Sequence, residues 1–179
     1  MLEWLVDDEG NVLLDDECNT LASEYTKVLQ TLINNIMTFL NVSSFDVTFV
    51  AKVLKRLETF MYVFKEETND DWLIAFAISK VESHIKTVTN SKSVNDNLVA
   101  IAVDRVCGEF LYSKKQTNQL SELPFDLETA VKSVQIGDTN ITFAIGEGAT
   151  TDEQKFDALI AYLVNKGENE ILCYRRISW

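Results

Sequence analysis

Hydrophobic side chains recur at steps of three and four residues along much of the chain, which is the spacing of one face of an α-helix. The pattern predicts helices over 17–40, 47–64, 69–90 and 98–111. In the third of these, the predicted inward face holds Leu73, Phe76, Ala77, Val81, His84, Ile85 and Val88. A short polar loop joins the third helix to the fourth, so we expect these two to pack antiparallel as a helical hairpin.

Local signals mark the ends of these two helices. Asn69 or Asp70 can cap the N-terminus of the helix predicted over 69–90. Asp70 and Asp71 also place negative charge at the positive end of the dipole of this helix. Asn90 is a suitable C-cap residue. Gly108 lowers the stability of the helix predicted over 98–111 by about 1 kcal/mol relative to alanine. A close helix crossing at that position would explain its presence.

The period of the pattern changes after a polar connector at 112–127. Alternating residues at 131–136 and 139–145 flank Gly137-Asp138 and predict a β-hairpin. Thr150-x-x-Glu153 then matches a capping box for a helix that ends at Gly167. The last residues, EILCYRRISW at 170–179, predict an extended strand that needs a partner, either the hairpin or another chain.

These elements predict a mainly α fold: a bundle of four to five helices with a small C-terminal β-hairpin and a terminal extended strand. We divide the chain into three parts. Residues 1–46 form an N-terminal hairpin and acidic helix, 47–127 form the helical core, and 128–179 hold the β-hairpin, a helix and the extended segment.

Charge narrows the possible functions. The formal net charge is -12. Residues 1–30 hold eight acidic residues against one lysine, a local charge of -7. This composition disfavours binding to the nucleic-acid backbone, because such binding relies on lysine and arginine. The acidic segment is either a solvated face or a patch that faces a basic partner or a DNA channel.

The sequence offers little catalytic chemistry. Cys18, Cys107 and Cys173 are widely spaced and fit reduced thiols of an intracellular protein. His84 is the only histidine, and its position on a hydrophobic stripe favours a packed core or interface imidazole. We find no pattern typical of a zinc site, a phosphate loop, a signal peptide or a membrane-spanning helix. We therefore expect no enzyme activity, no cofactor and no metal.

Several motifs resemble the phage head–tail connector (adaptor, or head-completion) family, in the form found in clostridial phages and prophages. They are DDWLIAFAISKVESHIKTVTN, the helix NLVAIAVDRVCGEFL, a strand pair around VQIGDTNITF, the helix FDALIAYLVN and the ending CYRRISW. The resemblance covers residues 47–179, and the hairpin and ending are its most distinctive parts. The acidic helix and the segment before it are an N-terminal addition.

The resemblance implies a structural virion protein located in the neck, at the head–tail junction, after assembly in the host cytoplasm. Members form a ring of about a dozen copies below the portal protein and join it to the next neck or tail protein. DNA passes through the ring without specific binding, and no membrane is involved. Alternatives are another neck or tail component, such as a stopper or terminator, and a cytosolic acidic regulator that acts through protein–protein contacts.

The C-terminal part is where we expect protein contacts. Tyrosine, tryptophan and arginine are enriched at interface hot spots, and an unpaired strand can add to a neighbour's sheet. The segment could equally complete the sheet of its own chain. The expected interface residues are Tyr174, Arg175, Arg176, Ile177, Trp179, Ile141 and Phe143.

Overall fold

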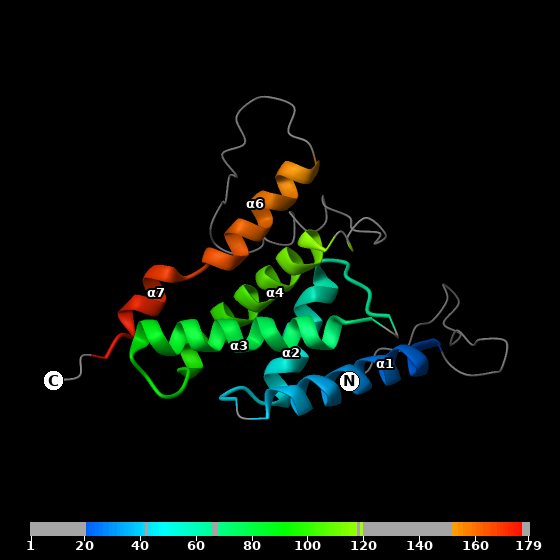
Figure 1. Cartoon of the computed structure of the whole chain (residues 1–179), viewed down its shortest axis with the longest axis horizontal. Coiled ribbons are helices and arrows are strands. Elements are labelled where there is room, and N and C mark those ends of the chain that lie inside the picture. The colour runs from blue at the N-terminus through cyan, green and yellow to red at the C-terminus, as the bar shows by residue number, and fades with distance from the viewer. Residues whose placement is uncertain (1–20, 42, 66–67, 118, 120–151, 177–179) are drawn as a thin grey trace, which may run out of the picture.

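The computed structural model describes residues 21–41, 43–65, 68–117, 119 and 152–176 (Figure 1). Within these ranges it contains helices, turns and irregular segments, and no strand. The helices are α1 (Leu21–Leu40), α2 (Val47–Thr59), α3 (Asp70–Thr89), the short 3-10 helix η1 (Asp96–Leu98), α4 (Val99–Gln116), α6 (Asp152–Asn165) and α7 (Glu168–Cys173). The expectation of a mainly α fold is confirmed. The predicted β-hairpin at 131–145 and the predicted N-terminal hairpin lie outside the described residues.

Helix α4 is at the centre of the fold and contacts α2, α3 and α6. Every residue from Ile101 to Gly108 is buried, as expected for a helix covered on several sides. Helix α1 packs across α2 and α3. One continuous hydrophobic core extends from Leu32 on α1 to Ile171 on α7.

Cross-helix ion pairs confirm the antiparallel hairpin of α3 and α4. Asp70 at the start of α3 pairs with Lys114 near the end of α4. Lys80, further along α3, pairs with Glu109, which lies earlier in α4. The two helices therefore run in opposite directions.

Gly108 lies at the crossing of α4 and α6. A Cβ atom at this position would be 2.8 Å from Leu163 Cβ and 2.9 Å from the backbone nitrogen of Val164. Only glycine therefore lets the two helices approach this closely, which confirms the expected close crossing.

Left-handed residues end two helices where the sequence places the stops. Asn90 has φ 50° and ψ 45°, and its N–H group donates to the carbonyl oxygen of Lys86, so it caps α3 as expected. Gly167 follows α6 with φ 68°. It also precedes α7 directly, so this one residue turns the chain from one helix into the next.

Two predicted helix boundaries are wrong. The helix predicted over 47–64 ends at Thr59, and Met61 adopts φ 62°. Met61 is consequently exposed, while Phe60 and Phe64 on either side of it are buried. Helix α4 continues to Gln116, so the first residues of the predicted connector are helical.

The predicted terminal strand is also wrong in its described part, because residues 168–173 form α7. The turn at Gly167 brings α7 onto α3, where Ile171 is fully buried. The inward face of α3 differs from the prediction as well. Ile74, Ile78 and Ile85 are buried, whereas Phe76 and His84 point to solvent.

Candidate protein-interaction surfaces

The C-terminal segment, residues 174–176, is attached to the end of α3. The N–H group of Arg176 donates to the carbonyl oxygen of Thr89 at 2.8 Å, and the Asn90 side-chain amide donates to the carbonyl oxygen of Arg176 at 3.2 Å. Tyr174, Arg175 and Arg176 are exposed, and no carboxylate of the described residues pairs with either arginine. These three predicted interface residues therefore sit together on an accessible surface.

The other predicted interface residues, Ile177, Trp179, Ile141 and Phe143, lie outside the described residues. Beside the C-terminal segment is a cavity of about 190 Å³, lined by Thr89, Ser91, Ser93, Asn95, Leu98, Tyr174 and Arg176. Hydroxyl and amide side chains dominate this lining, so the segment presents its aromatic and cationic groups next to polar surface.

A second surface lies near the other end of α3 and is formed by three stacked aromatic residues, here called the aromatic cluster: Phe39, Trp72 and Phe76. The ring centroids of Phe39 and Trp72 are 3.8 Å apart, and those of Trp72 and Phe76 are 5.8 Å apart. Their exposed fractions are 36%, 49% and 65% respectively. Three adjacent, partly exposed aromatic side chains form a hydrophobic patch of the kind that marks interaction sites.

Asp71 gives the aromatic cluster a negative edge. Its carboxylate accepts a hydrogen bond from the Asn35 side chain at 3.0 Å and one from the N–H group of Trp72 at 2.8 Å. A carboxylate can accept further hydrogen bonds, and no cation of the described part of the chain pairs with this one. The same exposed face of α3 continues into an open hollow of about 480 Å³, lined by Ser79, Glu82, Ser83, Lys86 and Thr87.

The hydrophobic pattern of the sequence did not indicate the aromatic cluster. Trp72 did not fit the predicted inward stripe, and Phe76 was assigned to that stripe. The available signal was the spacing of Trp72 and Phe76, which places two aromatic side chains on one helical face. The third member, Phe39, comes from α1, and its position follows only from the packing of α1 on α3.

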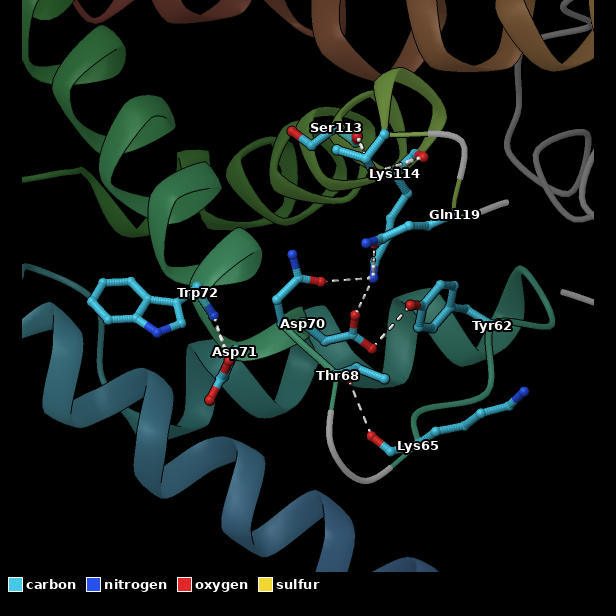
Figure 2. A network of polar contacts seen from close by, with 11 residues as sticks. Tyr62, Lys65, Thr68, Asp70, Asp71, Trp72, Ser113, Lys114 and Gln119 are labelled. Atoms are coloured by element: carbon cyan, nitrogen blue, oxygen red, sulfur yellow. Dashed lines mark hydrogen bonds and ion pairs between the residues drawn. The ribbon is translucent and has the colours of Figure 1, made fainter. Parts of the chain in front are cut away.

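A buried polar network fixes the helix end that carries the aromatic cluster (Figure 2). The Asp70 carboxylate pairs with the Lys114 ammonium and accepts a hydrogen bond from the Tyr62 hydroxyl at 2.9 Å. Lys114 also donates to the side-chain oxygens of Gln119 and Asn69. Burial, followed by the charge of Asp70 and the hydrogen bond to it, raises the pKa of Tyr62, so this hydroxyl remains a neutral donor. The sequence indicates that Asp70 caps α3 or places negative charge at its N-terminus. In the structure, Asp70 also pairs with Lys114 of α4 and with Tyr62.

Another polar network joins α4 to α6 and α7. Arg105 donates to the carbonyl oxygen of Lys166 at 2.7 Å and to the Glu168 carboxylate. The hydrogen bond from Arg105 holds the pKa of Glu168 below its usual range. His84 Nε2 lies 3.5 Å from the same carboxylate and is exposed, so the core position expected for this imidazole is wrong, while the alternative of an interface position stays a prediction. These contacts attach α7 to the core.

The described residues contain no group of three or more His, Cys, Asp or Glu side chains placed to hold a metal ion. Across the same part of the chain, no helix combines the length and hydrophobicity needed to span a membrane. Cys107 is buried and Cys173 is exposed, and both are free thiols. Cys18 lies outside the described residues.

Comparison with known proteins identifies no relative: no family model, no curated protein and no solved structure matches this chain. The two surfaces described above are therefore the basis for any functional assignment, together with the sequence motifs.

Proposed function

We propose that this chain is a structural interaction subunit, a phage head–tail connector that works through protein contacts. In this role it joins the portal protein to the next neck or tail protein, as one copy in a ring. The observation that carries the proposal is the exposed group of Tyr174, Arg175 and Arg176, attached by hydrogen bonds to the end of α3. Aromatic and arginine side chains presented on a firm support are typical of interface hot spots.

Three further observations support this proposal. The sequence motifs that resemble the connector family include the C-terminal ending that carries these residues. The aromatic cluster provides a second, separate contact surface, which a subunit with several neighbours requires. The net charge of -12 suits a surface that DNA passes without binding, because phosphates are repelled by carboxylates.

Co-expression with the portal protein of the same phage tests the proposal. We expect co-purification with the portal and a ring of density below it in electron micrographs. A variant in which Tyr174, Arg175 and Arg176 are replaced by alanine should lose the association while remaining folded. The matched control is a triple alanine variant at Lys27, Lys52 and Lys55, which are exposed on α1 and α2.

Other outcomes would replace the proposal with a different function. Presence of the protein in virions at another layer would make it a stopper, terminator or other tail component. Its absence from particles, combined with binding to a basic DNA-handling protein, would indicate a cytosolic regulator. Neither result would be expected from a connector.

A further inference from the structure

The two surfaces of the chain are complementary in chemistry. The aromatic cluster, with Asp71 at its edge, offers π faces and a carboxylate that no cation of the described residues occupies. The C-terminal segment offers two exposed arginines that no carboxylate of those residues occupies. Arginine binds favourably to carboxylates, and its guanidinium group also stacks on the faces of aromatic rings, tryptophan above all.

The two surfaces are too far apart to meet within one molecule. Trp72 lies near the start of α3, and the C-terminal segment is bonded to Thr89 at its end. At a rise of about 1.5 Å per residue, this interval of the helix is about 25 Å long. The hydrogen bonds at Thr89 and Asn90 hold the arginines at that distance.

We propose that these surfaces bind each other between copies, so that Arg175 and Arg176 of one molecule dock on the aromatic cluster and Asp71 of the next. This inference rests on the proposed function, since it names the contact between neighbouring subunits. The pairing joins two different surfaces, and its repeated use in one direction generates a closed ring or an open filament. A reciprocal two-fold dimer, in which the arginines of each copy meet the aromatic cluster of the other, would use the same contacts and stop at two copies.

The test uses the full chain without any phage partner. Sedimentation velocity and native mass spectrometry of the wild type, over roughly 1 to 500 μM, should show a mass that increases with concentration. Trp72→Ala and the double variant Arg175→Glu/Arg176→Glu should each weaken this association by about tenfold or more. A wild type that stays monomeric throughout this range would overturn the proposal.

Matched controls separate a specific contact from a general effect. Met61 and Trp72 are both 49% exposed, so Met61→Ala removes a comparably accessible apolar side chain elsewhere. Lys52→Glu/Lys55→Glu introduces the same change of charge on the exposed face of α2. Both controls should associate like the wild type. Circular dichroism and thermal unfolding establish that each variant is folded, and Phe76→Ser provides a second variant of the aromatic cluster, at a side chain that is 65% exposed.

Mixing the two defective variants gives the decisive result. Trp72→Ala keeps its arginines, and Arg175→Glu/Arg176→Glu keeps its aromatic cluster, so one intact contact can form between them. We expect 1:1 heterodimers and nothing larger. A mixture that remains monomeric, or variants that associate like the wild type, would show that these surfaces do not bind each other.

The outcome can be distinguished from that of the test for the proposed function, although both tests change Arg175 and Arg176. A chain that joins phage particles but does not self-associate through these residues fails this inference alone. A chain that forms the mixed heterodimer but never enters a particle fails the connector proposal alone.

Discussion

Lys114 pairs with Asp70 across the α3–α4 hairpin, although the side chains retain only 4% and 1% of their exposure. Removing one partner of a buried ion pair leaves an uncompensated charge, and typically costs about 3–5 kcal/mol. We therefore expect Lys114→Met to lower the free energy of unfolding by about 3 kcal/mol or more, measured by urea denaturation.

The pair of Lys80 and Glu109, in which the lysine is largely exposed, provides the control for this prediction. The Lys80 side chain is 66% exposed. Lys80→Met should therefore cost less than about 1 kcal/mol. Combining Lys114→Met with Asp70→Asn should recover part of the lost stability, because no charge is then left buried. Equal effects of Lys114→Met and Lys80→Met would contradict a buried role for the Asp70–Lys114 pair.

Gly108→Ala should destabilise the protein even though alanine favours helices by about 1 kcal/mol. The added methyl group would lie 2.8 Å from Leu163 Cβ, and α6 would have to move away from α4. Overpacking of this kind typically costs about 1–3 kcal/mol. The control Ala100→Gly, at an exposed position of α4, measures helix propensity alone. A Gly108→Ala variant more stable than the wild type would refute the close crossing.

The ionisation of Glu82 should make the stability of the protein depend on pH. Burial alone would raise the pKa of Glu82, but hydrogen bonds from Lys86, the Ser44 N–H group and the Ser43 hydroxyl outweigh it and hold the pKa below its ordinary value of 4.5. Because the pKa of Glu82 is lower in the folded state than in the unfolded state, its ionised carboxylate stabilises the fold at pH values above the unfolded-state pKa. This stabilisation is lost as the pH falls through the folded-state pKa.

Glu82→Gln should accordingly lower stability at neutral pH and reduce the loss on acidification. Urea denaturation of both proteins between about pH 7 and about pH 3 measures the difference, which should shrink as the pH falls. A difference that stays constant across this range would mean that the charge of Glu82 does not contribute.

The two described cysteines should differ strongly in reactivity. Burial, followed by the charge of Asp104, raises the pKa of Cys107, and its side chain is fully buried. Cys173 is exposed. In the native protein, iodoacetamide should label Cys173 within minutes and leave Cys107 unmodified until urea is added, as read by peptide mass spectrometry. Labelling of Cys107 at a similar native rate would contradict its burial under α2.

Deleting residues 174–179 should impair assembly more than it lowers monomer stability. The described part of this segment is held by two hydrogen bonds to the end of α3, each with a net contribution of about 0.5–1.5 kcal/mol. Urea denaturation should thus show a modest loss, while portal association and self-association are abolished. A loss of stability large enough to unfold the monomer would assign the segment to the core.

Local sequence signals predicted much of the helical framework. The helices α1 and α4, the cap at Asn90 and the stop at Gly167 all follow from residues that lie close together in the sequence. Gly108 was also informative, since a glycine inside a strongly patterned helix requires a packing reason.

The errors came from contacts that local patterns do not contain. Residues 170–173, the part of the predicted strand that lies in α7, form too short a run for the pattern to distinguish a strand from a helix, and the turn at Gly167 decided between them. Asp70 looked like a terminal charge, and its partner Lys114 is far away in sequence. Phe76 matched the spacing of a core residue, yet the face of α3 that packs on α1 and α4 carries Ile74 and Ile78 instead.

The central position of α4 affects how the protein emerges from the ribosome. Among the described residues, its Gly108 face is covered by α6, which is synthesised more than thirty residues after α4 ends. During that interval the nascent chain can form the α2–α3–α4 layer, but α6 cannot yet cover this face. A translational pause or a truncation before residue 152 would therefore leave the α6-binding face of α4 without α6 and available to chaperones or to other nascent copies.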